Sequence, residues 1–150
     1  MKSNYKKILQ IAGLTFLFLL TDQITKYLIV KYKVFFDIIP GYFSIHEQFN
    51  TGAAFSMPIP SIILVIVTTV LIFVSGYLGV KNLNFKKWAT VIVASMFLSG
   101  AIGNLIDRIR LGAVVDFIDI WFYPVFNLAD LFLTVSIFYI LLFYGKIKRS

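Results

Sequence analysis

Two aspartates of this 150-residue chain stand where a carboxylate is costly, and that cost suggests chemistry. Asp116 has apolar residues on both sides, and Asp130 lies just inside an apolar stretch that runs to Tyr144. An ionisable side chain at the edge of a membrane-spanning segment is expensive to place and usually functional. Asp119 competes with Asp116 for the same role, because spacing alone does not separate the two.

A pair of such aspartates is suited to hydrolysis. Two carboxyl groups about 3 Å apart cannot both ionise, so one of them keeps a proton. The ionised partner can take a proton from a water that attacks a carbonyl carbon, while the protonated partner polarises the carbonyl oxygen. This chemistry needs no metal ion and no other cofactor, and the two pKa values belong to the pair.

Other hydrolytic chemistries lack their residues in this sequence. The chain has no cysteine, one histidine and no HExxH helix, which argues against a zinc site and a cysteine nucleophile. A Ser–His dyad would have to recruit His46, which we interpret as an exposed strand residue. A Ser–Lys dyad has no motif in its favour, so paired carboxylates remain.

Polar groups also occur near the ends of two apolar stretches. Asp22 and Lys26 are four residues apart and can pair on one helix face, with the Lys26 ammonium extending outward to the membrane surface. Asn104 lies one helical turn before Asp107 and Arg108. Asp107 can hold the Arg108 guanidinium in a fixed pose, where it can bind a carbonyl or a lipid phosphate.

Two further asparagines are candidates. Asn50 is followed by Thr51-Gly52-Ala53-Ala54-Phe55, where small residues let a ligand approach the backbone, although an ordinary turn explains the same pattern. Asn127 is well placed to cap a helix, and the helix dipole favours Asp130 in its first turn. Because capping residues are usually solvated and Asp130 lies close to the hydrocarbon boundary, we favour function over capping alone.

Membrane-spanning helices must position these side chains. The composition is 59% hydrophobic and 14% charged, which is more apolar surface than a soluble domain of this length can bury. Apolar stretches at residues 8–30, 61–80, 88–106 and 128–144 each approach the ~20 residues that a helix needs to cross a bilayer. We therefore predict a single domain of four transmembrane helices.

The charges predict the orientation of these helices. The net charge is +7, but the cations flank the apolar stretches and form no single stripe, which argues against nucleic-acid binding. Four spans put both termini on one side, together with nine cations and no acid, and the positive-inside rule makes that side cytoplasmic. The alternating residues 43–49 predict a short β element on the outer side. All seven acids also lie there: Asp22, Asp37, Glu47, Asp107, Asp116, Asp119 and Asp130.

Five motifs in this order resemble the signal peptidase II family, bacterial membrane aspartic peptidases that are also called lipoprotein signal peptidases. The resemblance covers nearly the whole chain and implies an all-α membrane protein with four transmembrane helices and a small extracytoplasmic β-cradle, supplied by residues 34–56. The motifs are Asp22-Gln23-x-x-Lys26, Asn50-Thr51-Gly52-Ala53-Ala54-Phe55, Gly103-Asn104-x-x-Asp107-Arg108, Val114-Val115-Asp116-Phe117 and Phe126-Asn127-x-Ala129-Asp130.

The resemblance also implies roles. Asp116, and not Asp119, would form the catalytic dyad with Asp130. The implied substrate is a prolipoprotein that carries a diacylglyceryl group on a cysteine, cut just before that cysteine, with globomycin-type cyclic peptides as inhibitors. A monomer suffices, because both aspartates come from one chain. Substrate-orienting residues would be Asn50, Gly52, Asn104, Arg108 and Asn127, and supporting residues would be Asp22, Lys26 and Asp107.

Leu131 departs from the family pattern, in which a serine commonly follows the last aspartate; its hydroxyl would at most tune the dyad. We expect the aromatic loop 118–125 to rest among lipid headgroups as an interfacial belt or lid.

The main alternative function is an ion-coupled transporter or proton channel, which predicts acids distributed across the membrane. A Mg²⁺-dependent headgroup transferase would need more carboxylates in one motif.

Overall fold

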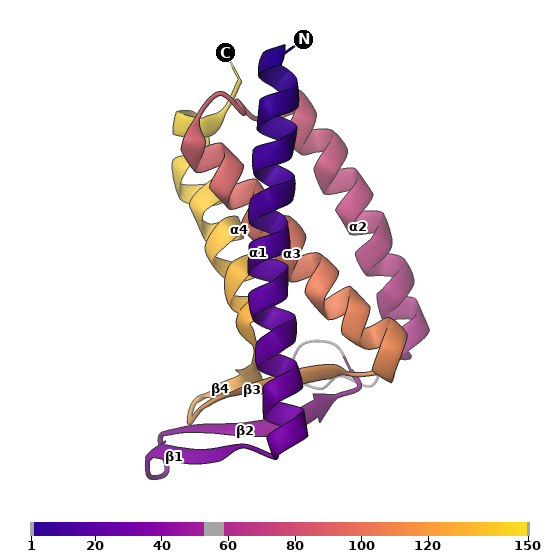
Figure 1. The fold of residues 1–150 in the computed structure, drawn as a ribbon, viewed down its shortest axis with the longest axis vertical. Coiled ribbons are helices and arrows are strands. Elements are labelled where there is room, and N and C mark those ends of the chain that lie inside the picture. The colour runs from indigo at the N-terminus through magenta and orange to yellow at the C-terminus, as the bar shows by residue number, and fades with distance from the viewer. Residues whose placement is uncertain (1, 53–58, 150) are drawn as a thin grey trace.

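A computed structural model describes residues 2–52 and 59–149 of the chain (Figure 1). Ala53, Ala54 and Phe55 of the second motif therefore lie outside the described residues. Four helices run side by side, a sheet closes one end of the bundle, and both chain termini lie at the other end (Figure 1). The elements in chain order are α1 (Lys2–Tyr32), β1 (Phe35–Ile39), β2 (Phe43–Asn50), α2 (Ser61–Asn82), α3 (Trp88–Leu111), β3 (Val114–Ile120), β4 (Tyr123–Phe126) and α4 (Leu128–Ile147).

This architecture confirms the predicted fold class of four apolar helices with a small sheet. Each of the four helices is long and apolar enough to cross a membrane. The helices extend beyond the apolar stretches from which we predicted them; α3, for example, continues to Leu111 instead of ending at residue 106. Its last turn carries Asp107 and Arg108, so the polar residues of that motif lie on regular helix.

Helix α3 is the central element of the bundle and packs against α1, α2 and α4. Small residues allow this close packing: Ser95, Ser99, Gly100 and Gly103 are all buried. A Cβ atom on Gly100 would collide with the Ala129 carbonyl oxygen and the Leu133 side chain of α4. This close approach of α3 and α4 brings the polar end of α3 next to the first turn of α4.

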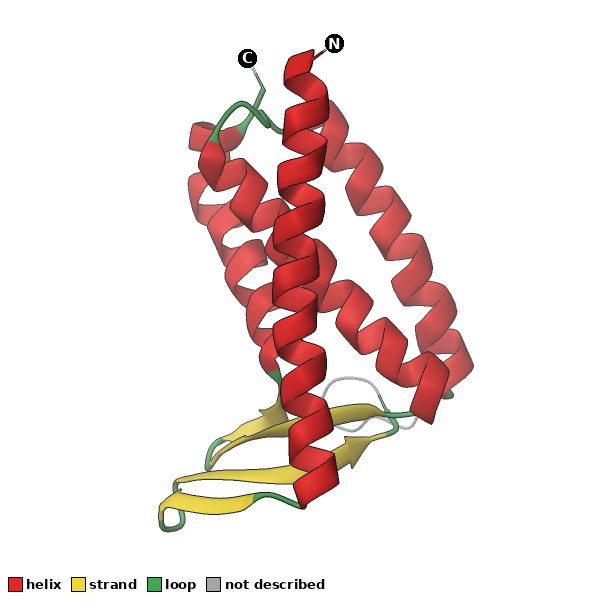
Figure 2. Cartoon of the chain, viewed as in Figure 1, coloured by secondary structure: helices red, strands yellow, loops and turns green. Residues whose placement is uncertain are grey.

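The four strands form one antiparallel sheet in the order β1-β2-β3-β4 (Figure 2). The sheet differs from our expectation, because half of it comes from residues after Val114 and not from residues 34–56 alone. Residues 118–125 are not a loop: they form the end of β3, a tight turn at Trp121 and Phe122, and the start of β4. The β-branched and aromatic residues of this segment favour a strand.

The register of β3 separates its two aspartates. Asp116 pairs with Gln48 of β2, whereas Asp119 pairs with Ser44. Successive side chains of a strand point to opposite faces, so residues three positions apart lie on different faces of the sheet. Gly112, with φ 71°, makes the turn from α3 into β3, and its N–H donates to the Arg108 carbonyl at 3.0 Å.

Candidate active site

Asp116 lies on β3 with its side chain held by two amides. The residue is only 2% exposed. Asn127 Nδ2 donates to Asp116 Oδ1 at 2.6 Å, and Asn50 Nδ2 donates to Asp116 Oδ2 at 3.1 Å. Asn50 is oriented in turn by the Gly52 N–H, which donates to its Oδ1 at 3.0 Å. Both carboxylate oxygens of Asp116 therefore have fixed donors.

Asp130 lies in the first turn of α4, where it completes a capping box with Asn127. The Asp130 N–H donates to Asn127 Oδ1 at 2.9 Å, and the Asn127 N–H donates to Asp130 Oδ2 at 3.3 Å. The other oxygen, Asp130 Oδ1, accepts from Asn104 Nδ2 at 2.7 Å. The capping interpretation is thus correct for the local geometry, and the same residues also join a larger network.

Asn127 and Asn104 connect the two aspartates. Besides its bond to Asp116, Asn127 Nδ2 donates to Asn104 Oδ1 at 3.2 Å, while Asn104 Nδ2 contacts Asp130. One amide bridge therefore runs between the carboxylates that the sequence motifs had singled out. Asp119 lies elsewhere, beside a pocket on the sheet that Lys33, Asp37 and Ser44 also line.

Lys26 is buried in the centre of the site, which corrects our prediction that it extends outward. It is 3% exposed, and its Nζ lies 3.0 Å from Asp22 Oδ2 and 2.7 Å from Asp107 Oδ2. It also donates to Asn104 Oδ1 at 3.1 Å. Lys26 reaches inward because two buried carboxylates from different helices compensate the cost of burying an ammonium group.

The two acidic partners of Lys26 also hold the backbone next to the two candidate catalytic aspartates. Asp22 Oδ1 accepts from the Ala129 N–H at 2.9 Å, and Ala129 immediately precedes Asp130. Asp107 Oδ2 accepts from the Val115 N–H at 3.3 Å, and Val115 immediately precedes Asp116. The ion cluster thus links α1 and α3 to both carboxylate-bearing elements.

Asp107 pairs with Lys26, and this corrects our prediction that Asp107 holds Arg108. Arg108 is half-buried, and the charges of Asp130, Asp116 and Asp107 all act on it. Sequence reasoning gave no role to Gln23, whose Nε2 donates to Asp107 Oδ1 at 3.0 Å and to the Gly103 carbonyl at 3.3 Å. The feature of the sequence that could have identified Gln23 is its position in the first motif, directly after Asp22.

Burial changes the acidity of Asp116. Desolvation, followed by the nearby charge of Asp130, raises the pKa of Asp116 to about 6, against the opposing hydrogen bonds from Asn50 and Asn127 and the charge of Lys26. A carboxyl group with this pKa exchanges its proton near neutral pH, as acid–base catalysis requires.

His46 belongs to a different surface of the sheet. Its Nδ1 lies 3.1 Å from Ser44 Oγ, and both residues line the pocket that also contains Asp119. His46 is half-buried, whereas we predicted that it would be exposed.

Among residues 2–52 and 59–149, no three His, Cys, Asp or Glu side chains gather in a way that could hold a metal ion.

Comparison with known proteins adds evidence that is independent of this geometry. A family model described as signal peptidase (SPase) II matches residues 14–145. A lipoprotein signal peptidase of Caldanaerobacter subterraneus subsp. tengcongensis is 41% identical over 134 residues, covering 85% of this chain and 92% of the relative. One from Staphylococcus aureus (strain JH9) is 34% identical, covering 81% and 78%.

A solved structure is also similar. Its title is "Bacterial membrane enzyme structure by the in meso method at 2.3 A resolution". It aligns with a TM-score of 0.81 and 29% sequence identity, over 91% of this chain and 87% of the other. The similarity therefore extends over both the helices and the sheet.

Proposed function

Because this chain belongs to the signal peptidase II family, we propose that it is an aspartic endopeptidase that removes the signal peptide from diacylglyceryl-modified prolipoproteins. The chain is a multi-pass membrane protein of the lipoprotein signal peptidase type. The main observation in support of an aspartic mechanism is the amide bridge through Asn127 and Asn104, which joins Asp116 and Asp130 in one hydrogen-bond network.

The proposed reaction uses one proton shared by the two aspartates. The ionised carboxylate takes a proton from a water molecule, and the water oxygen attacks the scissile carbonyl carbon. The protonated carboxyl group donates to the carbonyl oxygen, so negative charge does not accumulate there. When the tetrahedral intermediate collapses, the C–N bond breaks and the leaving nitrogen takes the proton that the base had removed from water. One hydroxyl group of the intermediate returns its proton to the other carboxylate as the new carboxyl group forms, so the dyad again holds one proton. No metal ion and no other cofactor takes part.

Neighbouring side chains support this chemistry. The raised pKa of Asp116 lets the dyad hold one proton up to about pH 6, well above the range in which an ordinary aspartate keeps its proton. Asn50 donates to Asp116, and the charges of Asp116 and Asp130 act on Arg108, so the site has a donor and a cation suited to a peptide carbonyl or to the diacylglyceryl headgroup. We assign substrate orientation to them, with Gly52 fixing the Asn50 amide.

The proposed topology places the dyad on the outer side of the membrane. The nine cations near the termini and near residues 81–87 favour a cytoplasmic location for that end of the bundle. The sheet lies at the opposite end (Figure 2), and it contains Asp116 on β3, while Asp130 is in the first turn of α4 directly after β4. A diacylated prolipoprotein is itself anchored in the membrane, so it can reach this site laterally with its scissile bond near the interface.

The alternative functions have no support in the site. The family assignment favours a peptidase over an ion-coupled transporter or channel, and the candidate carboxylates lie at one end of the bundle. We propose that a monomer is active, because all residues of the network come from one chain.

A gel-shift assay with a diacylated prolipoprotein in detergent, with and without a globomycin-type cyclic peptide, tests the proposed peptidase function. Loss of the shift with the inhibitor is expected, and cleavage unaffected by it would contradict this assignment.

Asp119→Asn should retain at least about half of the wild-type cleavage rate. Asp119 lies on the face of β3 opposite to Asp116 and beside Ser44, so its charge is not part of the dyad. The same gel-shift assay measures this rate. Complete inactivity of a correctly folded Asp119→Asn protein would mean that the wrong β3 carboxylate has been assigned.

Asn50→Ala should move the alkaline limb of the pH–rate profile to higher pH. Asn50 donates to the Asp116 carboxylate and thereby lowers the pKa of Asp116, so removing this donor raises that pKa further. The wild-type enzyme should lose activity as pH rises through about 6 and the shared proton is lost. Cleavage rates from pH 4 to pH 9 test the shift; an unmoved limb, or one at lower pH, would disprove it.

A further inference from the structure

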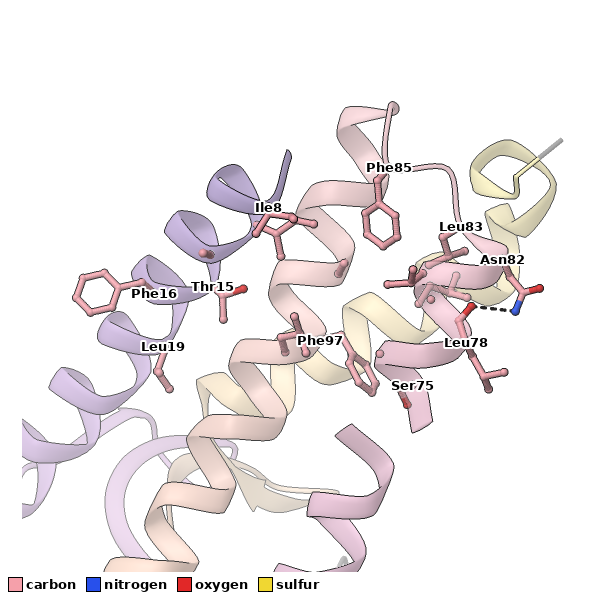
Figure 3. A pocket seen from close by; sticks show the side chains of 18 of the residues that line it. Ile8, Thr15, Phe16, Leu19, Ser75, Leu78, Asn82, Leu83, Phe85 and Phe97 are labelled. Atoms are coloured by element: carbon pink, nitrogen blue, oxygen red, sulfur yellow. Dashed lines mark hydrogen bonds between the residues drawn. The ribbon is translucent and has the colours of Figure 1, made fainter. Parts of the chain in front are cut away.

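An apolar cavity of about 790 Å³ lies between the helices at the end of the bundle that carries the termini (Figure 3). Residues from all four helices line it, among them Ile8 and Phe16 of α1, Leu78 of α2 and Phe97 of α3. None of the residues of the dyad network lines this cavity. It is therefore separate from the candidate active site.

Small residues create the space on the α2 side. Ser75, Gly76 and Gly79 face the cavity. A Cβ atom on Gly76 would meet no atom within 4 Å, and one on Gly79 would meet only Leu83 Cδ1 at 3.9 Å. None of the residues of α2 is buried, so α2 packs against α3 less closely than α1 and α4 do. The cavity is lined mainly by apolar side chains and opens at the surface of the helix bundle, so in a membrane it favours an alkyl chain.

Three lysines are immediate sequence neighbours of residues that line the cavity. Lys7 precedes Ile8, Lys81 lies between Val80 and Asn82, and Lys86 follows Phe85. Lys7 Nζ lies 5.7 Å from the centre of the Trp88 ring, an arrangement typical of the membrane interface. None of the seven acids of the sequence lies within ten residues of these cations along the chain.

This charge pattern selects among possible occupants. A signal peptide begins with a cationic segment, which these lysines would repel. A second copy of this chain would bring the same cations against themselves. An anionic lipid headgroup is attracted instead, at about 1 kcal/mol per basic residue near a membrane surface. The cavity lining also includes a buried hydroxyl, Thr15 Oγ1, that has no hydrogen-bond partner among residues 2–52 and 59–149, and an ester oxygen can accept from it (Figure 3).

We propose that this cavity binds one anionic phospholipid, with an acyl chain against Gly76 and Gly79 and the phosphate among Lys7, Lys81 and Lys86. The lipid fills the gap between α2 and the other helices and holds α2 in place. This site goes beyond the peptidase function, because it takes a resident lipid and no substrate.

Native mass spectrometry of the purified full-length protein tests the site. The protein is incubated with dioleoyl phosphatidylglycerol or dioleoyl phosphatidylcholine in detergent, and the bound lipid is counted. We expect at least fivefold more bound phosphatidylglycerol than phosphatidylcholine. Gly76→Phe fills the cavity and should lower phosphatidylglycerol binding at least fivefold. Gly13→Phe is the matched control, because Gly13 lies on α1 outside the cavity lining and a Cβ there also meets no atom. It should bind as the wild type does.

The charge requirement is tested separately by the double variant Lys81→Gln/Lys86→Gln, which should lose the preference for phosphatidylglycerol. Equal binding of the two lipids by the wild type, or wild-type binding by Gly76→Phe, would overturn the proposal. A dimer in place of a lipid-bound monomer would also overturn it. Prolipoprotein cleavage by Gly76→Phe in detergent should remain at the wild-type rate, so this test and the test of the peptidase assignment fail independently.

Discussion

Asp116→Asn and Asp130→Asn should each lower the rate of prolipoprotein cleavage by at least about a thousandfold, since general acid–base catalysis contributes 10²–10⁴-fold. An asparagine keeps the size of the side chain but can neither take a proton from water nor give one to a carbonyl oxygen. Each variant retains one acceptor oxygen for its bridging amide, from Asn127 at position 116 and from Asn104 at position 130. The new amide nitrogen faces the second donor, Asn50 Nδ2 or the Asn127 N–H, so the stability of each variant is measured beside its activity.

The gel-shift assay with purified protein measures this loss, and a thermal unfolding curve in detergent checks the fold. Asp37→Asn is the matched control, because Asp37 is an exposed aspartate on β1. It should retain the wild-type rate. Normal turnover by either dyad variant would exclude that aspartate from the reaction.

Lys26→Met should destabilise the protein by about 3–5 kcal/mol, the usual cost of removing one partner from a buried ion pair. The variant leaves Asp22 and Asp107 buried without the cation that lies within 3.0 Å of both. Because these two carboxylates hold the Ala129 and Val115 N–H groups, Asp130 and Asp116 should lose their fixed positions. Activity should fall together with the unfolding temperature.

A pH profile separates the electrostatic effect of Lys26 from its structural effect. The Lys26 charge lowers the pKa of Asp116, so its removal should raise that pKa and move the alkaline limb of the pH–rate profile of the residual activity upward. Lys26→Arg keeps the charge and should restore most of the unfolding temperature and the position of the limb. If Lys26→Met has the unfolding temperature of the wild type and the same alkaline limb of the pH–rate profile, the ion cluster has no positioning role.

The sequence predicted the helices well because long apolar stretches in a chain of this composition have few alternatives in a bilayer. The β3–β4 hairpin was not predicted from the sequence. Its apolar residues suggested an environment for Asp116, and its aromatic residues suggested a loop among the lipid headgroups. Val114, Val115 and Ile118 have the β-branched character of a strand, and that signal was present in the sequence.

Long-range contacts explain the errors within the site. Asp22 was correctly paired with Lys26, since i,i+4 neighbours meet on any helix. The other partners of Lys26, Asn104 and Asp107, come from α3, about 80 residues later, and only tertiary packing brings them together. The same packing pairs Asp107 with Lys26. Local spacing cannot reveal a buried ion cluster built from two helices.

Comparing the double variant Asp116→Asn/Asp130→Asn with the two single variants in the gel-shift assay tests the shared-proton dyad most directly. Residues that act as one unit lose almost everything with the first substitution, so their effects are strongly non-additive. The dyad account predicts that the double variant cleaves diacylated prolipoprotein about as slowly as either single variant. Losses that multiply in the double variant, or wild-type cleavage by either single variant, would contradict it.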